Sequence, residues 1–201
     1  MGLFDYGSGN LHSAARALAA AGAQVVLSGD IKQLAGCDAL VVPGVGAYAA
    51  CMGGLRAAGG AELLANWLPT GKPLLGICVG HQVLFDAGTE HGIRTSGFGI
   101  WPGTVQPLAA RRLPHMGWNR VAAPAGSRLF EGVEQEWFYF VHSYAAPQLA
   151  GGDDTGVATA THGVSFVAAV ERGSLCSTQF HPEKSGRAGA RLLRNWLALA
   201  S

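Results

Sequence analysis

The stretch Pro73-Leu-Leu-Gly-Ile-Cys-Val-Gly80 decides the fold of this 201-residue sequence. Residues 73–77 form an apolar run that predicts a buried strand, although Gly76 is a weak strand former. Residues 79–87 are compatible with a helix. A strand, a Gly-x-Cys-x-Gly turn and a helix are together typical of a nucleophile elbow, here with cysteine in place of serine.

The elbow makes Cys78 a candidate nucleophile. A sharp turn from strand to helix strains the backbone, and side chains two residues away on either side would clash, so glycine is needed at 76 and 80. The thiol then lies at a helix N-terminus, whose dipole favours the thiolate, and the Val79 amide can donate to an oxyanion. The alternative is a structural cysteine in a glycine-flanked turn.

A thiolate needs a base, and Gln179-Phe-His-Pro-Glu183 supplies one after the last predicted strand. Pro182 stiffens the turn between His181 and Glu183. Glu183 can hydrogen-bond the far ring nitrogen of His181, which fixes the tautomer and stabilises the imidazolium. The alternative is a surface histidine beside an exposed glutamate. The elbow together with this segment favours a catalytic triad of Cys78, His181 and Glu183.

Outward from the elbow, the first half of the chain alternates strands and helices. The apolar runs predict strands at residues 2–5, 24–27 and 39–42, and helices at residues 11–21 and 51–67. This alternation implies a parallel sheet covered on both faces. The second half is β-rich, with antiparallel strands predicted at residues 137–141, 157–161, 164–170 and 175–180, and a hairpin turn at His162-Gly163. A helix over residues 186–200 ends the pattern, so we expect one α/β domain over residues 1–201 with a mixed sheet.

The composition excludes several function classes. Hydrophobic residues make up 49% and charged residues 13%, which argues against a disordered chain. The net charge is +1 with scattered basic residues, so we expect no nucleic-acid partner. No apolar run is long enough to span a membrane, and no signal peptide is visible, so we expect a soluble cytosolic protein. The four cysteines lack zinc-site spacing, and we expect free thiols and no metal.

At this point the sequence resembles the class I, or triad, glutamine amidotransferases. They share the Gly-x-Cys-x-Gly elbow, a distant Phe-His-Pro-Glu segment and a glycine-containing loop that completes the oxyanion hole, here Pro43-Gly-Val-Gly46. The resemblance implies a flavodoxin-like, three-layer α/β fold with a central mixed, mostly parallel sheet.

Further segments resemble the glutaminase subunit of imidazole glycerol phosphate synthase, the HisH family, over essentially the whole chain. These segments are Asp5-Tyr-Gly-Ser-Gly-Asn-Leu11, Pro43-Gly-Val-Gly46, Pro114-His-Met-Gly-Trp-Asn119, Phe140-Val-His-Ser-Tyr144 and Phe180-His-Pro-Glu-Lys-Ser185. The segment from Pro114 to Asn119 is the most family-specific, because the elbow alone fits any class I amidotransferase.

Two features depart from the family pattern. Gly80-His-Gln82 stands where the family usually has methionine before the glutamine, and this triplet is more typical of anthranilate synthase glutaminase components. We expect His81 to pack or to face solvent away from the site. Family members also usually have a few more residues before Asp5.

The resemblance implies site residues and a reaction. Cys78, His181 and Glu183 hydrolyse glutamine to glutamate and ammonia, without a cofactor. Val79 and either Val45 or Gly46 donate amides to the oxyanion, and the loop amide has to turn before it can do so. The residues implied to hold glutamine are Gly44, Gln82, Glu90, His142, Ser143 and Tyr144.

The resemblance also implies a partner. The family forms a heterodimer with a (β/α)₈ barrel cyclase subunit, which uses the ammonia to make imidazole glycerol phosphate and an aminoimidazole carboxamide ribonucleotide. The residues implied to face this partner are Asn10, Trp118, Tyr139 and Lys184. The turn Gly7-Ser-Gly-Asn10 precedes a helix and could suggest a phosphate site, but its resemblance is to the partner-facing loop.

Three alternatives remain open. The chain could be the glutaminase component of another synthase, for anthranilate or pyridoxal phosphate. A PfpI-like protein also places a cysteine in an elbow, but it lacks the Phe-His-Pro-Glu segment. A regulatory subunit could keep the fold without the chemistry, although the intact triad argues against that.

Overall fold

The computed structural model describes residues 1–149 and 154–199, and its centre is a seven-stranded sheet in the order β11-β12-β13-β4-β3-β1-β2. The pairs β13-β4, β4-β3, β3-β1 and β1-β2 are parallel, whereas β12 pairs antiparallel with both β11 and β13. The strands are β1 (Gly2–Phe4), β2 (Val26–Ser28), β3 (Leu40–Val42), β4 (Leu74–Ile77), β11 (Gly156–His162), β12 (Val164–Arg172) and β13 (Leu175–Thr178). The predicted mixed, mostly parallel sheet is confirmed.

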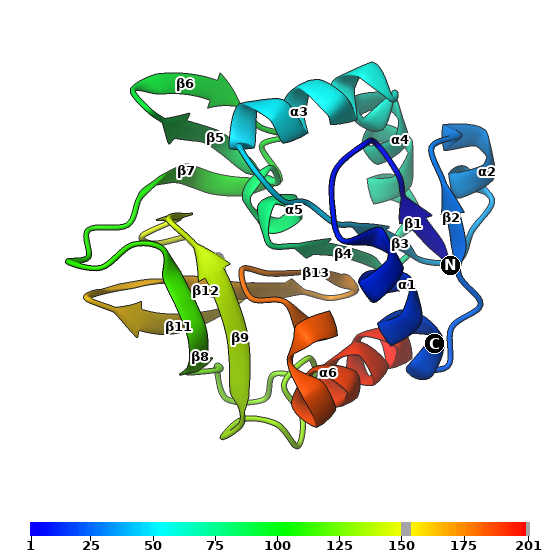
Figure 1. The fold of residues 1–201 in the computed structure, drawn as a ribbon. Helices are drawn as coiled ribbons and strands as arrows, with labels where there is room; N and C mark the ends of the chain where they lie inside the picture. Colours follow the sequence, from blue (N-terminus) through cyan, green and yellow to red (C-terminus); the bar gives the residue numbers. More distant parts are fainter. Residues whose placement is uncertain (150–153, 200–201) are drawn as a thin grey trace.

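Helices cover both faces of this sheet. In Figure 1, α1 and α6 lie below it and α2, α3 and α4 lie on the opposite side. The helical segments are α1 (Leu11–Ala20), α2 (Ile31–Ala35), α3 (Tyr48–Ala57), α4 (Gly60–Trp67), α5 (Val79–Gln82) and α6 (Gly186–Ala198), with 3₁₀ turns η1 (Leu68–Thr70) and η2 (Pro182–Lys184). On α6, Leu192, Leu193 and Trp196 are buried, and Leu197 and Leu199 are partly buried, as the apolar pattern predicts.

Two smaller sheets stand beside the central one, at the left of Figure 1. One is four-stranded in the order β10-β7-β5-β6, and the other pairs β8 with β9. Their strands are β5 (Phe85–Glu90), β6 (Ile93–Ser96), β7 (Trp101–Pro107), β8 (His115–Arg120), β9 (Trp137–His142) and β10 (Tyr144–Ala145). The apolar patterns predicted β9, but not β6, β7, β8 or β10, and they did not predict α2.

The helix after the elbow is much shorter than predicted. It ends at Gln82, and β5 begins at Phe85, so the expectation of a helix over residues 79–87 was wrong. A longer helix would need the carbonyls of Val83 and Leu84 for its own amides. Instead, the amide of Phe98 bonds to the Val83 carbonyl at 2.8 Å, and the amides of Ile100 and Trp101 bond to the Leu84 carbonyl. Distant residues therefore compete successfully with the local helix.

The other boundaries differ in smaller ways. The helix predicted over residues 51–67 is two helices, because Gly59 adopts a positive φ of 76° between α3 and α4. The predicted hairpin turn at His162-Gly163 is confirmed between β11 and β12. The predicted end of the last helix at Ala200 lies outside the described residues. Among the residues that the structure describes, no helix is long and apolar enough to cross a membrane.

Candidate active site

Cys78 sits in a strained turn between β4 and α5. Its φ of 57° and ψ of −112° place a non-glycine residue in a region that side chains rarely adopt. The glycines on either side explain how the turn is possible. A Cβ added at Gly80 would lie 1.9 Å from the Val42 carbonyl oxygen, and one at Gly76 would lie 2.6 Å from the Gly80 oxygen. The steric reasoning for the elbow is therefore confirmed, but α5 has only four residues, so the dipole behind the thiol is short.

The order of the strands brings His181 to Cys78. Strands β4 and β13 are parallel neighbours, with Ile77 opposite Thr178, so the residues after both strands meet at one sheet edge. The Cys78 amide donates to the Thr178 carbonyl at 2.8 Å. The backbone of His181 is fixed on both sides, because its amide donates to Tyr139 and its carbonyl accepts from the Ser185 hydroxyl. Residues about one hundred positions apart in the chain thus share one site.

His181 is paired with Glu183 in a nearly dry environment. Its Nδ1 lies 2.7 Å from Glu183 Oε1, and the two side chains are 3% and 4% exposed. Burial lowers the pKa of His181, but its interactions with Cys78 and Glu183 outweigh burial and raise the pKa to about 9. Because Glu183 engages Nδ1, Nε2 is the ring nitrogen left for the thiol and for a substrate. The arrangement can hold a proton on the imidazole beside a sulfur nucleophile.

A cavity of about 200 Å³ adjoins this pair. It brings together segments that are far apart in the sequence: the loop after β3, the elbow, β5, the end of β9 and the turn at η2. Its lining residues are Val45, Gly46, Tyr48, Cys78, Val79, Gln82, Glu90, Val141, His142, Ser143, Tyr144, His181 and Lys184. All the residues implied to bind glutamine line it except Gly44, whose carbonyl bonds to the Val79 amide instead.

Gln82 lines the cavity, and its side-chain amide nitrogen is fully used within the protein. Its Nε2 donates to the Tyr144 carbonyl at 2.8 Å and to Gln179 Oε1 at 2.9 Å, which uses both amide hydrogens. The carbonyl of Tyr144 can only accept, so the nitrogen must face it. The Oε1 atom of Gln82 is therefore the atom suited to accept a hydrogen bond from an ammonium group. Glu90 Oε2 accepts from the Tyr48 amide at 2.8 Å, at the start of α3.

The loop at residues 43–46, here called the oxyanion loop, is held by hydrogen bonds within the protein. The Val79 amide donates to the Gly44 carbonyl at 3.3 Å, and the Val45 amide donates to Ser8 Oγ at 3.1 Å. The Ser8 hydroxyl in turn donates to the Val45 carbonyl at 2.8 Å, and Cys51 Sγ lies 3.2 Å from the same oxygen. The Val79 and Val45 amides are thus occupied within the protein, so neither can hold an oxyanion until this loop changes conformation.

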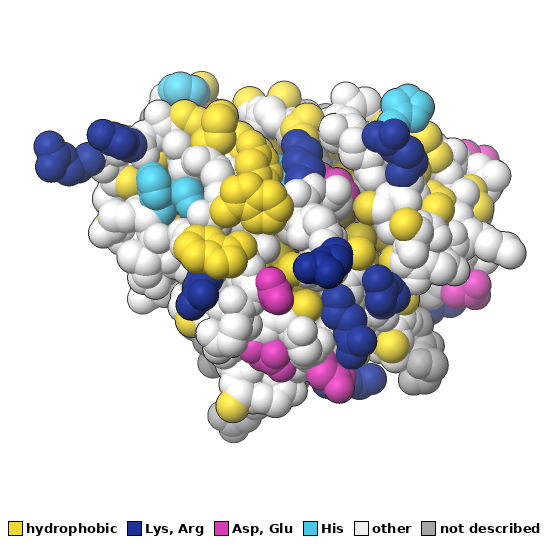
Figure 2. All heavy atoms as spheres, turned by 60° about the horizontal axis from the view of Figure 1, so that its bottom comes forward, with side chains coloured by type: hydrophobic (Ala, Val, Ile, Leu, Met, Phe, Trp, Pro, Cys, Tyr) yellow, Lys and Arg dark blue, Asp and Glu magenta, His cyan; other side chains and the backbone are white. Residues whose placement is uncertain are grey.

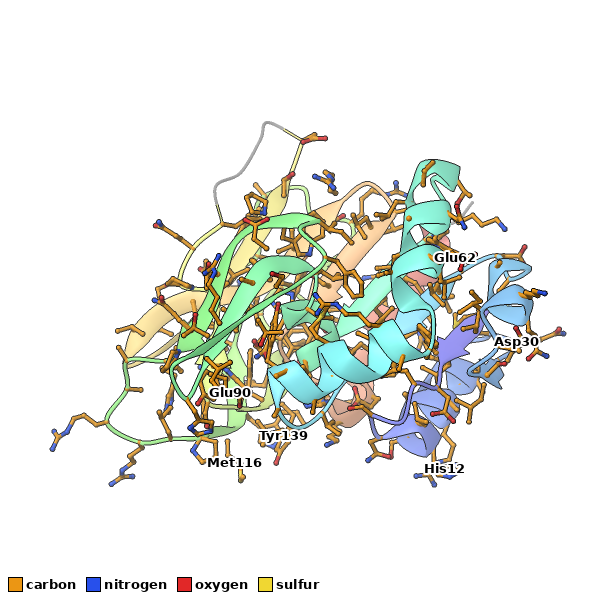
Figure 3. All side chains as sticks on the ribbon, turned by 90° about the horizontal axis from the view of Figure 1, so that it is seen from above. His12, Asp30, Glu62, Glu90, Met116 and Tyr139 are labelled. Carbon is orange, nitrogen blue, oxygen red and sulfur yellow. The ribbon has the colours of Figure 1, made fainter. Side chains whose placement is uncertain are left out.

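The residues implied to face a partner lie outside the cavity, apart from Lys184. Asn10 caps α1 and accepts from the Ser13 amide at 3.3 Å. Trp118 and Tyr139 are opposite each other on β8 and β9, with ring centroids 5.8 Å apart, and Trp118 is 54% exposed. Figure 3 shows Tyr139 and Met116 on the same side of the molecule as the cavity residue Glu90. Figure 2 shows hydrophobic side chains gathered on one face, with lysine and arginine side chains around them.

Several residues of the site carry no signal in the sequence. Gln179, Tyr48 and Ser8 reach it only because strands and loops distant in the chain adjoin it. His81, the departure from the family pattern, is fully buried and faces away from the cavity, as expected for a packing residue. Its Nδ1 lies 2.7 Å from Ser177 Oγ, which also accepts from Trp101 Nε1. The four cysteines are free thiols, as predicted, and all of them are buried, Cys78 included. Residues 1–149 and 154–199 contain no metal-binding cluster.

The fold and this site define a class. The family model described as glutamine amidotransferase class-I matches residues 2–200, and the chain belongs to that family. Its relatives narrow the class to the HisH family. A protein of Leifsonia xyli subsp. xyli named imidazole glycerol phosphate synthase subunit HisH is 58% identical, with 97% of this chain and 96% of that protein covered. A protein of the same name from Cutibacterium acnes is 57% identical over 98% of this chain and 95% of its own length.

Solved structures support the fold. A crystal structure described as a glutamine amidotransferase has a TM-score of 0.76 at 21% identity, and the match covers 99% of this chain and 97% of the other. The glutaminase domain of a Trypanosoma brucei CTPS with bound acivicin has a TM-score of 0.66 at 16% identity, covering 99% and 92%. At these identities the likeness concerns the fold alone, and it confirms the predicted class I amidotransferase architecture.

Proposed function

We propose that this chain is the glutaminase subunit of imidazole glycerol phosphate synthase and supplies ammonia for histidine biosynthesis. The observation that carries the proposal is the buried arrangement of Cys78, His181 and Glu183 beside a cavity. The shared name of the relatives favours this synthase over the anthranilate and pyridoxal phosphate enzymes. His81, the one residue that is more typical of anthranilate synthase components, is buried outside the cavity and takes no part in the proposed chemistry.

The first chemical step forms a thioester. The Cys78 thiolate attacks the side-chain amide carbon of glutamine, and the carbonyl oxygen becomes an oxyanion. His181, held by Glu183, gives a proton through Nε2 to the leaving nitrogen, which departs as ammonia. The fixed Nδ1 contact with Glu183 keeps the imidazole in the tautomer and orientation that this transfer needs.

The second step regenerates the thiol. His181 removes a proton from a water molecule, the water attacks the glutamyl thioester on Cys78, and glutamate leaves. The same nitrogen therefore acts as acid in the first step and as base in the second. No cofactor takes part in either step as we propose it.

Glutamine is held at its amino-acid end. We assign Gln82 Oε1 and the free carboxylate oxygen of Glu90 to the ammonium group, because both residues line the cavity and both are acceptors. The backbone of His142, Ser143 and Tyr144 borders the same end. Gly44 does not line the cavity. It belongs to the oxyanion loop, whose conformation determines whether the oxyanion hole can form.

Activation requires the oxyanion loop to turn. As described, the Val79 and Val45 amides are occupied by Gly44 and Ser8. Turning the loop would free the Val79 amide and direct an amide of Val45 or Gly46 at the oxyanion. One such donor contributes roughly 3–4 kcal/mol to lowering the barrier. The described conformation therefore corresponds to a resting state with low activity.

The subunit names of the relatives imply a second subunit of the synthase. We propose that this partner is a (β/α)₈ barrel cyclase that receives ammonia directly, because free ammonia in water would be protonated and lose its nucleophilicity. Asn10, Trp118, Tyr139 and Lys184 are the proposed contacts. The four free thiols suit a reducing compartment, and we place the complex in the cytoplasm.

Glutamate release tests the proposal. We expect little glutamine hydrolysis by the chain alone and strong stimulation by the barrel subunit with its nucleotide substrate. C78A should abolish hydrolysis, whereas the control C37A should retain it, because Cys37 is a buried thiol that precedes β3 while Cys78 follows the parallel neighbour β4. Hydrolysis that survives C78A, or stimulation only by an anthranilate synthase subunit, would show that the proposal is wrong.

A further inference from the structure

A row of hydrogen bonds leads from strand β8 to the glutamine cavity. Along β8 the side chains alternate, so that Met116 and Trp118 are exposed while His115 is buried. His115 lies opposite His142 in the β8–β9 register, and its Nδ1 is 2.9 Å from His142 Nε2. Asn119 Nδ2 lies 3.3 Å from the other ring nitrogen of His115. The far end of the row is His142 Nδ1, 3.0 Å from the Tyr144 carbonyl.

The positions of the hydrogens follow from this carbonyl. It can only accept, so His142 Nδ1 donates and His142 Nε2 is left as the acceptor. His115 must then donate through Nδ1, and its Nε2 accepts from the Asn119 amide. Burial lowers the pKa of His142 to about 3 and that of His115 to about 4, so both rings stay neutral near pH 7. The row therefore has one consistent direction, from Asn119 to the Tyr144 carbonyl.

The Tyr144 carbonyl accepts hydrogen bonds from two residues that line the cavity. It accepts from both His142 Nδ1 and Gln82 Nε2, and all three residues line the cavity. His115 is itself held between two rings: it stacks on Phe140 at 4.7 Å and on His162 at 4.3 Å. A ring packed on both faces keeps its donor aimed at His142. If the donor is lost, the buried acceptor His142 Nε2 has no partner, so the His142 ring is held less firmly against the carbonyl that orients Gln82.

We propose that His115 is a positioning residue for glutamine, acting through His142 and the Tyr144 carbonyl on the Gln82 side of the cavity. The proposal rests on the proposed glutaminase function. His115 does not line the cavity and touches neither Cys78 nor His181, so its loss should weaken glutamine binding while the chemical steps continue. The Michaelis constant for glutamine should rise while kcat changes little.

Three substitutions of His115 separate its hydrogen bonds from its packing. H115F keeps a stacked ring and loses both bonds. H115Q places an amide near the Nε2 position, where it reaches Asn119 but not His142. H115N places an amide donor near the Nδ1 position, where it can reach His142. The matched control is H162F, which makes the same chemical change in the neighbouring stacked ring, whose own bond goes to the Arg112 carbonyl rather than to the cavity.

The measurement is glutamine hydrolysis by each variant assembled with the partner subunit and its nucleotide substrate. We expect H115F and H115Q to raise the KM for glutamine about tenfold with kcat within about twofold, and H115N to restore most of the loss. H162F should leave both constants unchanged. Reaction of Cys78 with iodoacetamide, measured by mass spectrometry, should proceed at the same rate in all variants, because the triad is not disturbed.

The outcomes separate the two proposals. If the unsubstituted complex does not hydrolyse glutamine, the proposed function is wrong and the role of His115 falls with it. If that complex is active and H115Q leaves the KM unchanged, only the role of His115 is overturned. An equal rise of KM in H162F, or slower iodoacetamide reaction in H115F, would point to general disturbance and would also overturn it. If H115F does not fold, H115Q and H115N still decide the question.

Discussion

A methyl group at Gly80 should damage the elbow more than any other single carbon added nearby. In G80A the new Cβ would lie 1.9 Å from the Val42 carbonyl oxygen, 2.9 Å from the Val42 carbonyl carbon and 3.1 Å from the Pro43 carbonyl carbon. Real Cβ atoms essentially never come within 3.0 Å of another heavy atom, so the two segments have to separate by about 1 Å. All three atoms belong to backbone at the end of β3, which no rotamer change can move aside.

The size of the effect follows from this overlap. Overpacking that involves only side chains costs typically 1–3 kcal/mol, and a backbone clash should reach at least about 3 kcal/mol. For a chain of this length that corresponds to a fall of roughly 6–12 °C in Tm. The shift also moves α5, which carries Val79 and Gln82. A displacement of about 1 Å in a catalytic site costs on the order of 100-fold in rate.

Thermal unfolding and glutamine hydrolysis by the two-subunit complex measure these effects. The matched control is G53A, which adds the same methyl group to an exposed position in α3 that has no heavy atom within 4 Å. In the interior of a helix this change should stabilise the chain by roughly 0.5–1 kcal/mol and leave hydrolysis intact. If G80A unfolds at the same temperature as G53A and hydrolyses glutamine normally, the steric account of the elbow is refuted.

Two further predictions concern the site. Burial lowers the pKa of His181, but Cys78 and Glu183 raise it more, from 6.5 to about 9. The proton on His181 therefore stabilises the fold fully below pH 6.5, and this stabilisation is lost as the pH rises through about 9. Urea unfolding should show a decline on the order of 3 kcal/mol across that window, and E183Q should make it shallower; an unchanged pH dependence in E183Q would contradict this account. S8A removes the hydroxyl that accepts from the Val45 amide and donates to the Val45 carbonyl, so the loop should turn more readily and glutamine hydrolysis without the partner should rise about tenfold. A partner-free rate equal to that of the unsubstituted chain would show that Ser8 does not hold the resting conformation.

The elbow could be predicted from sequence because its requirement is local. Only glycine fits two residues before and after Cys78, and this spacing is visible in the chain. The pairing of His181 with Glu183 is also local, since the two residues are separated by a single proline. The pairing of Cys78 with His181 was predicted from chemistry, because a thiolate needs a base, but the strand order that brings them together, with β13 next to β4, was not predicted.

The parts that could not be predicted depend on distant partners. Whether residues 83–87 continue a helix is decided by the amides of Phe98, Ile100 and Trp101, which take the carbonyls that the helix would use. Ser8 contacts the oxyanion loop only because the ends of β1 and β3 lie next to each other. The row from Asn119 to Tyr144 depends on the register of β8 against β9, and no apolar pattern predicted β8.

The place of β13 in the central sheet has a consequence for a chain that is still being synthesised. Strand β13 lies between β12 and β4, yet it follows β4 by about one hundred residues. Because domains are made from the N-terminus onward, Cys78 leaves the ribosome well before His181, whose imidazole is the base. Until β13 pairs with β4, the nascent protein holds a nucleophile without a base, and glutamine is not consumed by unfinished copies. Catalysis therefore requires that β13 and the residues after it have been synthesised and that β13 has paired with β4.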